Sequence, residues 1–171
     1  MNFVRAYDYL TQARARLFDW IGPLNQEQYT QAFPFGLGTL RATMLEIAWG
    51  EWVYTQRLQG IVELPPREDW PYGEDRPPTF RELEAAWTDQ APSTRQALAG
   101  IADWETPVEY RPAGPDRTSI VAATKGDLAT QLCFHEIHHR AQAMAMLRQL
   151  GVPAQDLDYS ILVFRRREEP A

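Results

Sequence analysis

The feature that most limits how this chain can fold is the segment 134–142, which contains all three histidines of the protein. It lies within a helical pattern at 125–150, which Gly151 and Pro153 end. At about 100° per residue, His139 lies roughly 40° from His135, on a side of the helix that we expect to face the core. The same side carries Leu128, Leu132, Gln142, Met146 and Leu150.

The pair His135 and His139 suggests a metal site, because residues i and i+4 lie one turn apart on the same helical face. Two core imidazoles hydrogen-bonded to their neighbours are the alternative. His138 lies at the edge of this side and suits either a supporting role or a surface role. Glu136 and Arg140 point away from it, and we expect Arg140 to face outward in a structural or interface pair.

Two histidines need a third protein ligand, and no further histidine exists in the chain. On the helix predicted at 39–58, Glu46 shares a side with small and apolar residues, so its carboxylate can complete the site. The alternative is a buried Glu46 paired with an arginine such as Arg14. Arg14 itself lies on an apolar stripe. We expect its aliphatic stem to pack there while its guanidinium reaches solvent, and the less favoured alternative is a guanidinium turned toward the interior. Glu51, roughly 140° away from Glu46, is expected to face solvent or pack elsewhere.

The remaining pattern predicts an all-α fold, a four-helix bundle forming a single domain over 1–171. The loop 61–78 holds five prolines, and its length suggests that it crosses between two neighbouring helices that run parallel. Pro92 should kink or break the third helix. The predicted elements are helices at 2–21, 39–58, 79–100, 125–150 and 156–164, a connection at 24–38, and a small hairpin pairing 108–110 with 119–121 around the turn-rich stretch 112–116.

Composition narrows the partners. The net charge of −6 argues against nucleic acid, which favours a basic face. No stretch is long and apolar enough for a membrane span. The chain has one cysteine, Cys133, which we interpret as a packed small hydrophobic residue. A single cysteine allows no internal disulfide, which suits the cytoplasm. A second apolar stripe of Ile137, Met144 and Leu147 on the last long helix predicts a homodimer or a covering terminal helix.

Several segments together resemble the DinB-like (DinB/YfiT) family. Residues 135–142, His-Glu-Ile-His-His-Arg-Ala-Gln, followed by Leu-Arg-Gln-Leu-Gly at 147–151, resemble that family's last helix. The second helix is similar in its opening Thr39-Leu40-Arg41, its Glu51-Trp52 pair and its end at 57–60, and 156–159 resembles the family's ending. The resemblance spans nearly the whole chain.

The resemblance implies an up-down-down-up four-helix bundle, usually dimeric, with a divalent metal held by three side chains. Two ligands carry over as His135 and His139. The third is usually a histidine five residues before the Glu-Trp pair, and this chain has Glu46 there. Two nitrogens and one carboxylate suit zinc, iron(II), manganese or nickel.

The activity that the resemblance implies is thiol-dependent transfer or a related metal-dependent reaction, a hydrolase included, with a small thiol as cofactor or substrate. Gln142 is expected to hydrogen-bond this ligand or a group that supports the site. Two other interpretations stay open. One is a stress-associated dimer that binds metal without catalysis. The other is a metallopeptidase, since 135–139 also matches His-Glu-x-x-His, with Glu136 as general base.

Overall fold

The computed structural model describes all of the chain except residues 67–68, 72–76, 113–118, 166 and 168–171. Four long helices lie side by side: α1 (Phe3–Ile21), α3 (Leu40–Leu58), α4 (Phe80–Ala99) and α5 (Lys125–Gln149). The short helices α2 (Gln26–Thr30) and α6 (Tyr159–Val163) and a two-stranded sheet complete the described elements. The predicted mostly helical fold with a small hairpin is therefore confirmed.

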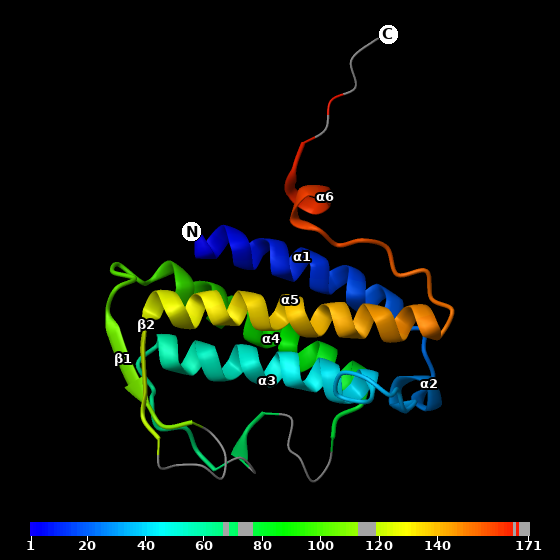
Figure 1. Cartoon of the computed structure of the whole chain (residues 1–171), viewed down its shortest axis with the longest axis horizontal. Helices are drawn as coiled ribbons and strands as arrows, with labels where there is room; N and C mark the ends of the chain where they lie inside the picture. The colour runs from blue at the N-terminus through cyan, green and yellow to red at the C-terminus, as the bar shows by residue number, and fades with distance from the viewer. Residues whose placement is uncertain (67–68, 72–76, 113–118, 166, 168–171) are drawn as a thin grey trace.

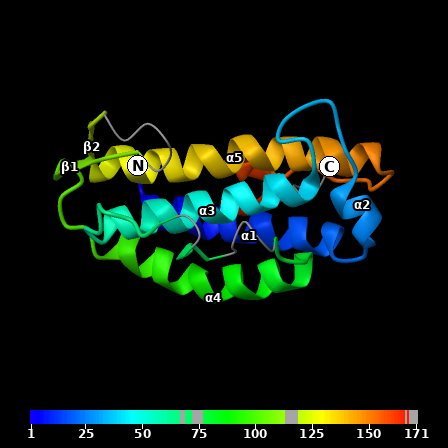
Figure 2. The same cartoon turned by 90° about the horizontal axis from the view of Figure 1, so that it is seen from below.

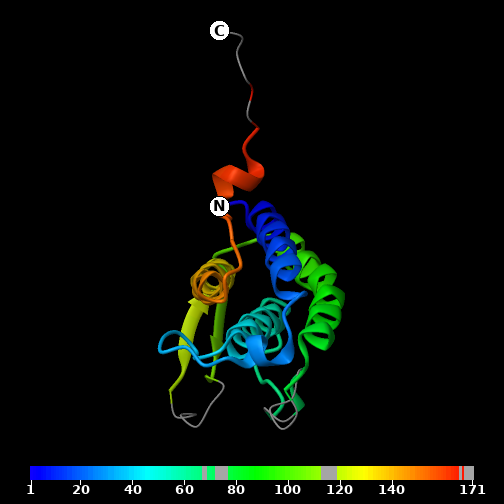
Figure 3. The ribbon, with the colours of Figure 1, turned by 90° about the vertical axis from the view of Figure 1, so that its right-hand side faces the viewer.

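The long helices contact one another in a ring, since α1 and α3 each pack against both α4 and α5. The colours in Figure 1 show that α1 and α5 run in one direction and α3 and α4 in the other. Seen along the helices in Figure 3, α6 lies outside the four long helices, on the side of α1. Because α3 and α4 run parallel, the connection between them has to travel back along the bundle.

Local sequence accounts for where the helices begin. Asn2, Thr39, Thr79 and Thr124 each accept a hydrogen bond from a backbone N–H in the first turn, and the last two form capping boxes. Helix α2 lies within the predicted connection 24–38 and was missed, although Asn25 and Gln28 form a capping box there. Side chains at these positions satisfy N–H groups that the helix itself leaves unpaired.

Pro92 does not break α4, contrary to one of the two predicted outcomes. Its missing N–H deprives the carbonyl of Thr88 of a partner, and both residues are exposed, so water can hydrogen-bond this oxygen. Buried Trp87 and Leu98 on either side hold the helix against the core.

The hairpin pairs β1 (Pro107–Tyr110) with β2 (Val121–Thr124), so the second strand lies later than the predicted 119–121. Tyr110 faces Val121 in the antiparallel register. The turn-rich stretch predicted at 112–116 lies outside the described residues after Pro112.

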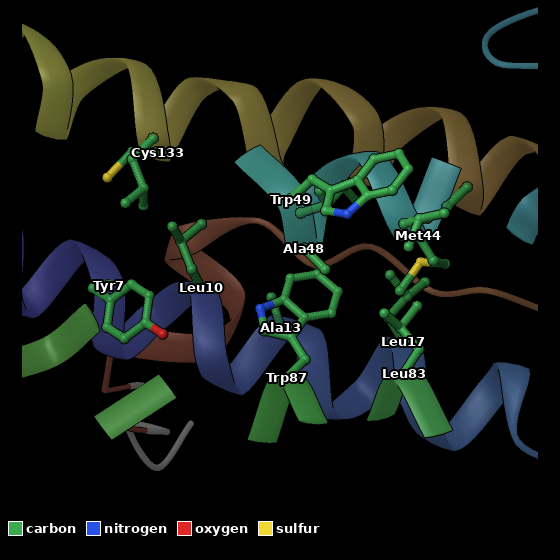
Figure 4. Packing of buried hydrophobic residues seen from close by; sticks show 14 of the residues in the cluster. Tyr7, Leu10, Ala13, Leu17, Met44, Ala48, Trp49, Leu83, Trp87 and Cys133 are labelled. Atoms are coloured by element: carbon green, nitrogen blue, oxygen red, sulfur yellow. The ribbon is translucent and has the colours of Figure 1, made fainter. Parts of the chain in front are cut away.

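The core between the helices is aromatic and aliphatic. Figure 4 shows Leu10 and Leu17 of α1 meeting Trp87 and Leu83 of α4, with Ala48 of α3 above them. Small residues such as Ala13 and Ala48, both fully buried, let these helices approach closely. Within the described residues, no helix is long and apolar enough to cross a membrane.

Candidate metal centre

The packing of α3 against α5 brings Glu46 together with His135 and His139. Each offers one ligand atom, and these atoms all lie within 4.8 Å of one another. The Nε2 atom of His135 is 3.5 Å from Oε1 of Glu46, and the two imidazole rings are 4.6 Å apart between centroids. Ligands of a tetrahedral metal with bonds of roughly 2.1 Å are spaced by about 3.4 Å, so the side chains present fit a divalent ion.

Gly50, one turn after Glu46, makes room for His135. A Cβ atom at this position would lie 2.5 Å from Cε1 and 2.6 Å from Nδ1 of the imidazole, much closer than van der Waals contact. The absence of a side chain at Gly50 therefore lets the ring lie directly against the backbone of α3. It is this close approach that brings the ring within reach of Glu46.

Gln142 orients two of the histidines. Its Oε1 accepts a hydrogen bond from Nδ1 of His139 at 2.9 Å, and its Nε2 donates to Nε2 of His138 at 3.0 Å. Since an amide oxygen only accepts, the proton of His139 lies on Nδ1 and its Nε2 lone pair remains for a metal. Burial lowers the pKa of His139, against the opposing effect of the Gln142 hydrogen bond, and so favours the neutral form that metals bind.

The histidine side of α5 is only partly buried: Leu128, Leu132 and Met146 on it lie in the core as expected, whereas its polar residues lie at the edge of the bundle. His135 and Glu46 have side-chain exposures of 16% and 38%, and His139 and Gln142 are half-buried. The buried face of α5 extends beyond this side and also includes Glu136, Arg140 and Leu147. The candidate site is consequently open to small molecules from solvent.

The interior holds a cluster of charges that the sequence reasoning did not assemble. Arg14 forms ion pairs with Glu51 and with Glu136, the latter at 2.6 Å, and all three side chains are at most 5% exposed. The expectation that the charged group of Arg14 reaches out is therefore wrong, and its partner is Glu51 rather than Glu46. Glu51 also accepts hydrogen bonds from Tyr7, Trp87, Gln90 and Thr94.

Burial and ion pairing shift the pKa values of Arg14 and Glu136. Burial acts to lower the pKa of Arg14, but the carboxylates of Glu136 and Glu51 raise it above its usual value. Burial raises the pKa of Glu136, while Arg14 acts in the opposite direction. A signal was present in the sequence, because acidic residues on two helices and an arginine on a third all lie on faces that also carry core residues.

Two further residues of α5 are buried. Arg140 is 4% exposed and donates to the hydroxyl of Tyr9, so the expectation that it faces outward is wrong. Cys133 is 3% exposed, and burial raises the pKa of its thiol to about 12, as suits a packed small hydrophobe. Met144 and Leu147 of the predicted second apolar stripe are buried within the chain, whereas Ile137 is 40% exposed.

The sequence model of the DinB family matches residues 1–168. The chain belongs to the DinB family. A comparison with curated proteins found no match. The family resemblance inferred from the second and last long helices is thus confirmed, and this DinB chain has a Glu/His/His group that could hold a metal ion.

Proposed function

We propose that this DinB chain is a metalloenzyme, most simply a thiol S-transferase, in which Glu46, His135 and His139 hold a divalent ion. The observation that carries the proposal is the convergence of these three ligand atoms within 4.8 Å. The donor set of two nitrogens and one carboxylate oxygen suits zinc, iron(II), manganese or nickel. Three protein ligands would leave coordination positions for a small molecule.

The bound metal would supply Lewis acidity, lowering the pKa of a coordinated thiol so that it is held as a thiolate. The residues of the chain do the rest. Gln142 fixes the tautomer and orientation of His139, and through His138 it ties the neighbouring turn to the site. The open edge between α3 and α5 admits the second substrate. Gln142 could also contact the thiol ligand once it binds.

The test is elemental analysis of the purified protein beside Glu46→Gln and His139→Ala. Both variants should lose most of the metal, while Glu27→Gln, an exposed carboxylate on α2, should retain it. Equal metal content in all four proteins would refute the assignment. A thiol-conjugation screen with electrophilic substrates then separates a transferase from a stress-associated protein that binds metal without catalysis.

The peptidase alternative requires Glu136 beside the metal as general base. Its carboxylate is 2% exposed and paired with Arg14 in the bundle interior, on a different face of α5 from His135 and His139. A buried carboxylate in an ion pair cannot reach a water molecule on the metal. The geometry therefore favours the transferase over the peptidase.

We further propose a cytoplasmic homodimer of single-domain subunits with the family's up-down-down-up topology. An apolar groove between α1, α5 and α6 supports dimerisation, since Phe134, Ile137 and Phe164 line it while 59%, 40% and 60% exposed. Sedimentation analysis of Ile137→Glu tests this, because a charge in a subunit interface should produce a monomer. A wild-type chain that sediments as a monomer would refute it.

A further inference from the structure

A cavity of about 380 Å³ opens beside the candidate metal centre, and Glu46 and His135 form part of its wall. The cavity lies along α3, with Arg57 also in its lining, and the hairpin contributes Tyr110 and Val121. The metal ligands and a guanidinium thus border the same space. This arrangement raises the question of what the guanidinium binds.

Arg57 is buried without a counterion. It is 5% exposed, and within the described part of the chain its side chain has no hydrogen bond or ion pair. Its Nε atom is completely buried and lacks an acceptor. Burial lowers the pKa of Arg57, although an arginine stays protonated at any ordinary pH. A buried charge in this condition is costly unless something pairs with it.

The aromatic neighbours of Arg57 explain where its side chain lies, but they do not provide acceptors for its N–H groups. Its Cζ atom lies 3.6 Å from the ring centroid of Tyr110 and 5.8 Å from that of Tyr54. Stacking of this kind engages the flat face of the guanidinium, whereas its N–H groups point outward in the plane. A purely structural arginine that joins the hairpin to α3 would need the stacking alone. The unused in-plane donors indicate an anionic ligand.

Part of the cavity lining is apolar. Trp49 and Trp70 line it, and their indole N–H groups donate to backbone carbonyls, of Pro71 at 2.7 Å and Pro65 at 3.0 Å respectively. With these donors satisfied, the remaining ring atoms of the two indoles are carbon. Val53 adds an aliphatic side chain to the same lining.

The two polar ends are separated by a defined length of α3. The ring of His135 packs on Gly50, and Arg57 follows two turns later, about 10 Å along the helix axis. A ligand that contacts both ends must therefore be extended. Arg57 is also the one arginine or lysine among the described lining residues, which suits a singly charged carboxylate better than a dianion.

We propose that this cavity binds a small molecule with a carboxylate at one end, held by Arg57, and a metal-binding group at the other end, with an apolar spacer between the aromatic walls. This inference rests on the proposed function, for which it supplies the substrate class: a carboxylate-bearing thiol or an acceptor of that shape. Arg57 acts as a binding residue that sets specificity and takes no part in bond making.

The test compares 6-mercaptohexanoate with 6-mercaptohexan-1-ol on the cobalt(II)-loaded full chain, following the thiolate-to-cobalt absorption band. The acid should bind about tenfold more tightly, as expected for one charge-assisted hydrogen-bond pair. In Arg57→Gln the acid should weaken to the level of the alcohol, while the alcohol should bind as before. Equal binding of acid and alcohol to the wild type, which needs no variant, would overturn the proposal.

Two further variants protect this reading from a folding artefact. Arg57→Lys keeps the charge and should retain part of the preference for the acid, provided that its far-ultraviolet circular dichroism matches the wild type. Arg16→Gln removes an exposed arginine on α1 and should leave both affinities unchanged. A preference for the acid that Arg57→Gln leaves intact contradicts the assignment of Arg57.

A metal-free arm separates this proposal from the proposed function. Calorimetric titration of the apoprotein with 3-phenylpropanoate and with 3-phenylpropan-1-ol should show binding of the acid that depends on Arg57. If this holds while neither thiol gives a cobalt band, the carboxylate site stands and the thiol chemistry fails. If both thiols bind cobalt equally and the apoprotein shows no preference, the thiol chemistry stands and the carboxylate site fails.

Discussion

Replacing Gly50 with alanine tests the candidate metal centre by adding a single methyl group, while none of the three proposed ligand residues is itself substituted. The added Cβ would lie 2.5 Å from Cε1 of His135, where carbon atoms prefer about 3.5–4.0 Å. The half-buried ring must therefore move by about 1 Å or swing away. Metal–nitrogen bonds tolerate about 0.2 Å, so the histidine would leave the coordination sphere. Losing one ligand of three should weaken metal binding by at least about 100-fold.

The effect on stability has the opposite sign without metal. Alanine is favoured over glycine inside a helix by about 1 kcal/mol, so the apoprotein should be as stable as wild type or slightly more stable. With metal at 1,000 times the wild-type Kd, the metal stabilises the wild type by about 4 kcal/mol and the variant by about 1.4 kcal/mol. For a chain of this length, that difference corresponds to a loss of about 5–11 °C in the metal-induced rise of Tm.

The assay is a pair of thermal melts, with and without zinc, beside a competition titration against a chromophoric chelator. Gly100→Ala is the matched control, since Gly100 ends α4 in a helical conformation and a Cβ there meets its nearest atom at an ordinary 3.5 Å. It should bind zinc as the wild type does. If Gly50→Ala also keeps wild-type zinc affinity, the imidazole of His135 is not a ligand and the reasoning fails.

Three other outcomes follow from the contacts around α5. Arg14→Met leaves two buried carboxylates without their cation and should lower the free energy of unfolding, measured in urea titrations, by about 3–5 kcal/mol. The control Arg16→Met, at an exposed arginine, should change it by less than about 0.5 kcal/mol. Similar losses in both variants would contradict the buried cluster. Gln142→Leu should weaken zinc binding about 10–100-fold in the chelator titration, because it releases the tautomer and orientation of a ligand imidazole; wild-type affinity would show that this hydrogen bond does not support the site. Burial raises the pKa of Cys133 from 9.0 to about 12. At pH 8 its reaction with a disulfide reagent should therefore be about 1,000-fold slower in the folded chain than in denaturant, because less of the thiol is ionised. Rapid labelling of the folded chain would disprove its burial.

The sequence predicted the long helices to within two residues at each end, because their caps and stop signals are local. It also grouped Glu46 with His135 and His139. This was possible because Glu46 shares a side of its helix with small and apolar residues, and the two histidines lie one turn apart on one side of theirs. What a helical wheel cannot decide is which of two amphipathic sides of α5 faces the interior. Glu136 was expected to point away from the core-facing side and Arg140 to face outward, yet both are buried.

The physical reason is that these charges are satisfied by other helices. Glu136 pairs with Arg14 of α1, and Arg140 pairs with Tyr9 of the same helix. A pattern within one helix contains no information about a partner that is over a hundred residues away. The partly exposed His135 and His139, by contrast, share a side of α5 with apolar residues, so the sequence pattern suggests that they are buried although they lie at an open edge.

The connection between α3 and α4 has a consequence for the ligand cavity that we propose. It exists because two adjacent helices point the same way, yet its Trp70 lines the cavity and its Pro71 anchors Trp49. The segment that the parallel helices require thus also forms part of the wall of this cavity. A substitution of Trp70 would therefore change the shape of the cavity together with the packing of this ring against Trp49 and Trp52 of α3.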